Sequence, residues 1–168
     1  MTSQHIAPFL AALSSAGFDH IYLNGTSPEA EFQKLLQYDR LQHNTTAFEY
    51  VFQVADQRED LHPEYNFVVF FHQGLPIALM EWVYASSRRP GDICDLGLFE
   101  VLSEHQGKGY GKTIMRAFCG NYVIRNRSQL QFDSTEDAVP FYKRVFDQIP
   151  GIKYTVGVYT GTFSVAPV

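Results

Sequence analysis

The sequence predicts a mixed α/β fold, namely one α+β layer sandwich that forms a single domain over residues 1–168. Two features predict it: the order of the apolar patterns and the length of the chain. Helical patterns come first, strand-like runs begin near residue 66, and strands then alternate with helices before two final strands. A chain of 168 residues is about one domain long and can bury a core without disulfides.

The first segment favours a helix. Apolar residues at helical spacing predict it over residues 3–16, and Gly17 is expected to end it. A short strand is predicted at 20–23, whereas residues 44–65 favour neither state.

A second helix is predicted after this strand. Ser27 is its expected N-cap, and Pro28 takes the first helical position, where the missing N–H group costs nothing. Leu41 continues the apolar stripe, so we expect one helix that reaches this residue.

Three strands are predicted in the middle of the chain. Dense β-type runs cover residues 67–71, 77–84 and 93–102, and residues 72–74 form the turn between the first two. Residues 88–91 are expected to form a loop. The third strand leads directly into a glycine-rich segment.

The second half alternates between helices and strands. Pro140 is tolerated only in a first helical turn, so its helix is expected to start near Glu136 or Asp137. The predicted segments are a helix with an apolar stripe over 114–122, a strand at 130–132, a helix to residue 149, and strands at 152–159 and 162–165.

Composition disfavours several classes of function. The chain has 18 acidic and 13 basic residues, a net charge of −5, which repels nucleic-acid backbones. No apolar run approaches the roughly 20 residues of a spanning helix, and we recognise no signal peptide, so a cytoplasmic protein without membrane partners is expected. Cys94 and Cys119 are expected to be buried thiols, and no residue spacing suggests a metal site.

The glycine-rich segment can bind phosphate. Gly107, Gly109 and Gly111 lie at a strand-to-helix junction, where backbone N–H groups and the helix dipole attract anions. A dinucleotide loop would need glycine at Lys112 or at Ile114. A nucleotide P-loop would need glycine at Gln106, although Gly111-Lys112-Thr113 fits its end. An acyl-CoA loop and a simple connecting turn are the other interpretations.

Two motifs resemble the GCN5-related N-acetyltransferase (GNAT) superfamily. Residues 98–111 resemble its main cofactor motif, Gln/Arg-x-x-Gly-x-Gly/Ala, through Gln106, Gly109 and Gly111. Residues 133–142 resemble its downstream motif, in which Ala138 precedes Phe141-Tyr142 by three residues.

The resemblance implies a fold and a co-substrate. The fold would be a central mixed, mostly antiparallel sheet of six to seven strands with helices on both faces. Residues 66–168 match well, and residues 1–65 form a divergent helical part. Acetyl-CoA would be the co-substrate. The residues implied in binding it are Phe99, Glu100, Val101, Gln106, Gly107, Lys108, Gly109, Tyr110, Gly111, Lys112, Thr135, Ala138 and Phe141.

The sequence also departs from the family. Ser103 replaces a usual proline, Thr135 replaces a frequent asparagine, and residues 145–147 lack a usual glycine. An additional helix precedes the first strand. By resemblance, the strand before the loop is expected to bulge near Val101 and to free N–H groups for the pantetheine and the thioester carbonyl.

Three residues are candidates for catalysis. Acyl transfer needs a neutral amine and a proton for the leaving thiolate. The resemblance makes Tyr142 the acid, unless it only completes an apolar helix stripe. Asp95, eleven residues before Gln106, takes the place of a glutamate in histone-type members, and Glu81 interrupts a strand that otherwise reads as buried. Either carboxylate is a candidate base, and a chain of water molecules is the alternative.

The expected function is transfer of an acetyl group from acetyl-CoA to a primary amine by direct attack in a ternary complex. The acceptor is expected to be a small molecule or a peptide, because acidic residues dominate the first 65 positions. A non-catalytic acyl-CoA sensor and a nucleotide-binding protein are the alternatives. The sequence leaves open whether the chain forms a homodimer.

Overall fold

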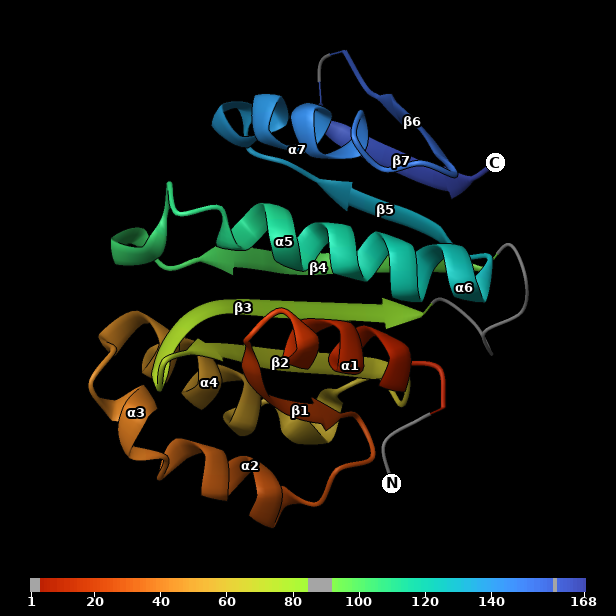
Figure 1. Cartoon of the computed structure of the whole chain (residues 1–168). Coiled ribbons are helices and arrows are strands. Elements are labelled where there is room, and N and C mark those ends of the chain that lie inside the picture. The colour runs from red at the N-terminus through yellow and green to blue at the C-terminus, as the bar shows by residue number, and fades with distance from the viewer. Residues whose placement is uncertain (1–3, 85–91, 159) are drawn as a thin grey trace.

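A single seven-stranded sheet forms the centre of the protein (Figure 1). The computed structural model describes residues 4–84, 92–158 and 160–168. The strand order is β1-β2-β3-β4-β5-β7-β6, and β4 and β5 are parallel whereas all other neighbours are antiparallel. The predicted fold class is therefore confirmed.

The elements alternate broadly as the sequence predicts. The strands are β1 (Asp19–Asn24), β2 (Tyr65–His72), β3 (Leu75–Tyr84), β4 (Ile93–Val101), β5 (Gln129–Asp133), β6 (Ile152–Val156) and β7 (Thr162–Pro167). The α-helices are α1 (Ala7–Ser15), α2 (Glu29–Leu36), α3 (Asp39–Gln42), α4 (Thr45–Asp56), α5 (Tyr110–Phe118), α6 (Ile124–Asn126) and α7 (Val139–Phe146). Shorter helical turns are η1 (Arg58–Asp60), η2 (Ser103–His105), the π-helical η3 (Cys119–Val123) and η4 (Glu136–Ala138).

Helices cover both faces of the sheet and define two cores (Figure 1). On one face, α1, α5 and η3 pack around Phe9, Trp82 and Phe118, and α7 packs on Phe132 and Phe163 of the same core. The indole of Trp82 donates a hydrogen bond of 2.9 Å to the hydroxyl of Tyr122. On the other face, α2, α3 and α4 pack over β2 and β3. Below, these are called the α5 face and the α4 face.

The N-terminal part corrects two expectations. Pro28 is the N-cap of α2 rather than its first helical residue, and the hydroxyl of Ser27 accepts a hydrogen bond from the N–H of Asn24. Leu41 belongs to α3, because the chain is extended at Tyr38 and the helix breaks there. The segment 44–65, which favours neither state in sequence, contains α4 with Asn44 as its N-cap.

Several boundaries differ in the C-terminal part. The turn η4 precedes α7, so the α-helix begins at Val139 with Pro140 in its first turn. Strand β6 ends at Val156, and both Tyr159 and the expected loop at 88–91 lie outside the described residues. Cys94 and Cys119 are buried as predicted, and burial raises the pKa of both thiols, that of Cys119 to about 12.

Strands β4 and β5 separate soon after they begin. Among the described residues, they pair only where Ile93–Asp95 faces Gln129–Gln131. The expected bulge is not near Val101, which pairs regularly with Ala78. The register between β3 and β4 shifts instead at Gly97, because Trp82 faces Leu96 and Glu81 faces Leu98. Because β4 pairs with β5 only over Ile93–Asp95, a gap opens in the sheet beside the second half of β4.

Candidate functional site

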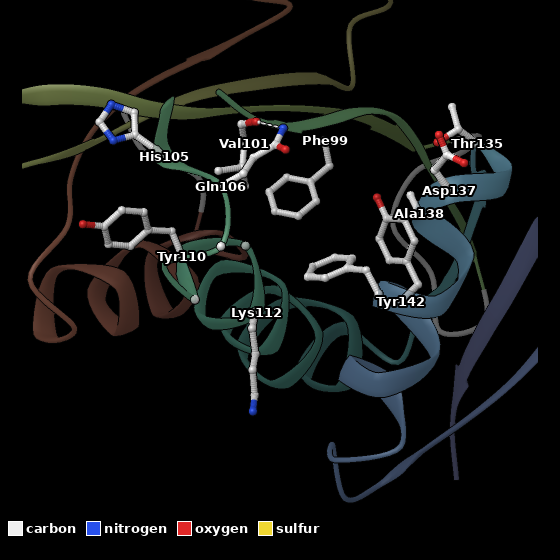
Figure 2. A pocket seen from close by; sticks show the side chains of 14 residues that line it. Phe99, Val101, His105, Gln106, Tyr110, Lys112, Thr135, Asp137, Ala138 and Tyr142 are labelled. Atoms are coloured by element: carbon white, nitrogen blue, oxygen red, sulfur yellow. Dashed lines mark hydrogen bonds between the residues drawn. The ribbon is translucent and has the colours of Figure 1, made fainter. Parts of the chain in front are cut away.

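A cleft of about 550 Å³ occupies the space where β4 leaves β5 (Figure 2). The end of β4, the glycine-rich segment with the first turn of α5, and the turns that begin α7 form its walls. The lining residues are Phe99, Val101, His105, Gln106, Gly107, Gly109, Tyr110, Gly111, Lys112, Thr135, Asp137, Ala138, Phe141 and Tyr142.

The glycine-rich segment needs glycine for its backbone conformation. Gly107 has a φ of +75° and Gly109 a φ of +84°, in the left-handed region that other residues avoid. A Cβ atom at either position would meet no other atom within 4 Å. Both glycines therefore face open space, which leaves the backbone accessible to a ligand in the cleft.

The N-terminus of α5 points into this open space. Gly109 is its N-cap, and the first N–H groups of an α-helix have no intrahelical acceptor. The N–H and the hydroxyl of Thr113 both donate to the carbonyl oxygen of Gly109, at 3.1 and 3.2 Å. The loop differs from a nucleotide P-loop at Gln106, where that motif has glycine.

Glycine at position 111 serves packing rather than backbone conformation. A Cβ there would lie 3.1 Å from Cγ2 of Val101 and 3.3 Å from Cζ of Phe141. The missing side chain thus allows α5 to approach β4 and α7 closely. This contact brings the three walls of the cleft together.

Gln106 fixes the start of the loop. Its side-chain amide donates a hydrogen bond of 2.9 Å to the carbonyl oxygen of Val101 (Figure 2). Lys112 supplies positive charge at the edge of the cleft, and its ammonium extends away from Tyr142 (Figure 2). Lys108 is exposed and does not line the cleft.

Tyr142 presents its hydroxyl to the cleft from α7. The side chain is only 7% exposed and packs against Phe132 and Phe141, with ring centroids 4.5 and 5.0 Å away. Its hydroxyl points into the space between Phe99 and Ala138 (Figure 2). Burial raises the pKa of Tyr142 to about 12, so the hydroxyl stays protonated at neutral pH and can donate a proton.

Residues from three other elements support the loop. The ring of Tyr110 contacts those of Phe18 and His72, with centroids 5.8 and 5.1 Å away, and these two rings also contact each other. Phe18 directly follows the turn after α1, so the additional N-terminal helix helps to hold the loop. At the other side, Asn44 caps α4 and donates a hydrogen bond to Glu104, two residues before Gln106.

The cleft contains twelve of the sequence-predicted residues, Tyr142 among them, but Glu81, Asp95, Glu100 and Lys108 lie outside it. It also contains two residues that the sequence prediction missed. His105 and Asp137 directly precede Gln106 and Ala138, so adjacency to the motifs was the available signal.

Glu81 lies on the α4 face of the sheet, since its neighbours Met80 and Trp82 belong to the core of the α5 face. Its carboxylate accepts a hydrogen bond of 3.2 Å from the hydroxyl of Tyr65, and Tyr50 of α4 hydrogen-bonds to it as well. Burial and this carboxylate raise the pKa of both tyrosines well above the usual range. Glu81 is thus half-buried and held in place.

Asp95 lies in a different environment. It faces Val83 in the register between β3 and β4, but its side chain is exposed. It also falls within the short stretch in which β4 still pairs with β5. The structure therefore separates the two candidate carboxylates: one is held and half-buried, the other is solvated.

Within the described residues, no three His, Cys, Asp or Glu side chains lie close enough to hold a metal ion. None of the described helices is long and apolar enough to cross a membrane.

Comparisons with known proteins agree with this geometry. The family model described as acetyltransferase (GNAT) domain matches residues 26–147. No curated protein matches the sequence at a significant level.

Solved structures share the fold at low sequence identity. Tetrahymena GCN5 is 15% identical with a TM-score of 0.54, over 89% of this chain and 96% of its own. An aminoglycoside acetyltransferase from an uncultured soil metagenomic sample, crystallised with sisomicin, is 13% identical with a TM-score of 0.53, over 86% and 95%. An acyl-CoA N-acyltransferase from Pseudomonas aeruginosa is 16% identical with a TM-score of 0.52, over 90% and 99%.

Proposed function

The chain belongs to the GNAT acetyltransferase family, and from this premise we propose that it transfers the acetyl group of acetyl-CoA to a primary amine of a small molecule or peptide. Membership in this family supports acyl-CoA-dependent N-acyl transfer in general. The choice of the acetyl group, the amine acceptor and direct attack in a ternary complex are the finer parts of the proposal.

The observation that carries the proposal is the cleft between β4 and β5. Its glycine-rich wall offers left-handed glycines and the free N–H groups of α5 to a pyrophosphate. Phe99 and Val101 lie on the stretch of β4 that has separated from β5, which suits an extended pantetheine chain. Tyr142 lies at the opposite wall, where the thioester would sit.

The residues then have defined chemical roles. A base takes a proton from the acceptor ammonium, and the amine nitrogen attacks the thioester carbonyl carbon. The carbon–sulfur bond breaks, and the hydroxyl of Tyr142 donates its proton to the leaving thiolate. The attacking nitrogen loses its second proton as the amide forms, and a proton from solvent restores the hydroxyl of Tyr142. The held position of Glu81 favours it over the solvated Asp95 as the base, with a chain of water molecules as the alternative.

The charge distribution supports an amine acceptor rather than a nucleic acid. Glu81 of β3 and Glu100 of β4 lie on the α4 face of the sheet. The acidic residues of α2 to α4 and η1 are mostly exposed. Negative charge on this side attracts cations and repels phosphate backbones.

Two experiments test the proposal. A thermal-shift screen with acetyl-CoA, CoA, ATP and GTP should show a raised Tm with acetyl-CoA and CoA, since a ligand that binds only the folded state stabilises it. Acetyl transfer is then measured on polyamines, aminoglycosides, amino acids, peptides and tRNA at low and moderate salt.

The outcomes of these experiments separate the alternatives. Binding of acetyl-CoA without transfer to any amine would indicate a non-catalytic sensor of the same fold. Stabilisation by ATP or GTP with magnesium alone would indicate a nucleotide-binding protein. Rapid acetylation of tRNA alone would contradict the proposed acceptor class.

A further inference from the structure

Three side chains meet on the α4 face of the sheet, over β2 and β3, and β4 lies between them and the gap. Glu81 comes from the centre of β3, Tyr65 from the start of β2, and Tyr50 from α4. The hydroxyl of Tyr65 donates to Oε2 of Glu81 at 3.2 Å, and Tyr50 hydrogen-bonds to the same carboxylate. Tyr65 is only 4% exposed, so solvent competes little for its hydroxyl.

We propose that Tyr50 and Tyr65 are positioning residues that hold the carboxylate of Glu81 over Gly97, as the base for the acceptor amine. The proposal rests on the N-acyltransferase function proposed above. Without donors, a glutamate side chain samples several rotamers. Two hydroxyl donors from two separate elements restrict it to one direction, and a fixed base is what proton transfer requires.

Gly97 provides the space for this carboxylate. It is the extra residue at the register shift of β4, and a Cβ atom there would lie 2.7 Å from Oε1 of Glu81. That distance is too short for any other residue unless the carboxylate moves. The oxygen that does not accept from Tyr65 therefore rests against the backbone of β4, two residues before Phe99 of the cleft.

The groups that face Glu81 set the sign of the expected pH effects. Tyr50 and Tyr65 are the hydrogen-bond donors from α4 and β2, and donors favour the ionised form of a carboxylate. Glu100 and Asp95 lie on the same face of β4, and negative charges disfavour that form. Removing a tyrosine hydroxyl should thus make the base harder to ionise, and removing the charge of Glu100 should make it easier.

The test measures kcat and kcat/KM against pH, with acetyl-CoA and the best amine of the panel above. In wild type, we expect the rate to fall at low pH as the base becomes protonated, and this fall is the acidic limb of the profile. Glu81→Gln should lose this limb. Tyr65→Phe should move that limb to higher pH by about one unit, the size expected for one hydrogen bond to a charged group. Glu100→Gln should move it to lower pH. The ionisation of the free amine is the same in all variants, so these shifts come from the enzyme.

Matched variants keep the test clear. Tyr154→Phe removes a tyrosine–carboxylate hydrogen bond of 2.8 Å, to Asp147, which lies away from the cleft, and should leave the limb unmoved. Gly97→Ala should displace the carboxylate and lower kcat, while the KM for acetyl-CoA stays near that of the wild type. Tyr50→Phe removes the second hydroxyl donor, and its ring is only half-buried. If Tyr65→Phe does not fold, Tyr50→Phe replaces it in the same measurement.

Each contrary result overturns a defined part of the proposal. If Tyr50→Phe and Tyr65→Phe lower the rate equally at every pH and leave the acidic limb at its wild-type position, the two tyrosines have only a structural role. A limb that persists in Glu81→Gln would exclude this carboxylate as the base. If wild type transfers no acetyl group to any amine, both the proposed function and the positioning role fail. If the enzyme is active but the tyrosine variants leave the acidic limb in place, only the positioning role fails.

Discussion

The amide of Gln106 and the carbonyl oxygen of Val101 lie 2.9 Å apart in a hydrogen bond that joins the first residue of the loop to the last residue of β4. The bond spans five residues and closes the chain over the turn η2. It holds the loop in register with the strand that would carry the pantetheine. The side chain that defines the family motif thus shapes the loop from within.

Gln106→Ala should raise the Kd for acetyl-CoA by about 2- to 10-fold, the value of one neutral hydrogen bond. The fold should persist, because the side chain lies at the surface of the loop. Calorimetric titration measures the change. Gln148→Ala, an exposed glutamine after α7, is the control and should bind as wild type does. Equal affinities would show that this bond does not organise the loop.

Tyr142→Phe should lower kcat by roughly 10²- to 10⁴-fold, the usual contribution of a positioned acid. Affinity for acetyl-CoA should change little, because the ring and its packing against Phe132 remain. Since burial raises the pKa of Tyr142 to about 12, its acidic form persists through neutral and moderately alkaline pH. The variant should accordingly be slow at every pH up to about 10, with no basic limb attributable to this residue below that value.

A rate for Tyr142→Phe equal to that of wild type across this range would place Tyr142 in the core only. Tyr154→Phe is the control, because its ring lies on β6 away from the cleft.

Both cysteines should resist thiol reagents in the folded protein. Cys94 and Cys119 are fully buried, and burial raises the pKa of both thiols, so little reactive thiolate is present at neutral pH. A spectrophotometric thiol assay should detect neither group under native conditions and both after unfolding in guanidinium. Fast labelling of the native protein would show that this part of the core opens readily.

Local patterns predicted the parts of the molecule that local physics determines. The strands β2 to β4 follow from dense apolar runs, and the glycine-rich loop follows from glycines at a strand-to-helix junction. Most of the cleft could be predicted because two short motifs supply its walls. The two motifs face each other across the gap between β4 and β5.

Contacts between distant segments explain what the sequence did not predict. The break of helix at Tyr38 and the fold of residues 44–65 depend on packing against β2, which no local pattern encodes. The bulge lies at Gly97, four residues from the expected position, because the register of β4 against β3 leaves this residue without a partner strand residue. The partners of Glu81 were missed for the same reason, since Tyr50 comes from the segment without a clear pattern.

The central claim is that the glycine-rich loop holds the pyrophosphate of acetyl-CoA, and Gly109→Asp tests it. The variant should remain folded, because a Cβ atom at this position would meet no other atom within 4 Å. Its carboxylate would stand in the open space before α5 and repel a phosphate. Gly109→Ala is the control: it carries the same unfavourable φ of +84° without the charge, so it separates backbone strain from repulsion.

Calorimetric titration of acetyl-CoA into wild type and these two folded variants is the most direct measurement. We expect wild type to bind, Gly109→Ala to bind more weakly, and Gly109→Asp to show no detectable binding. Wild-type affinity in a folded Gly109→Asp protein would contradict the account, because the loop could not then be the site of the cofactor phosphates.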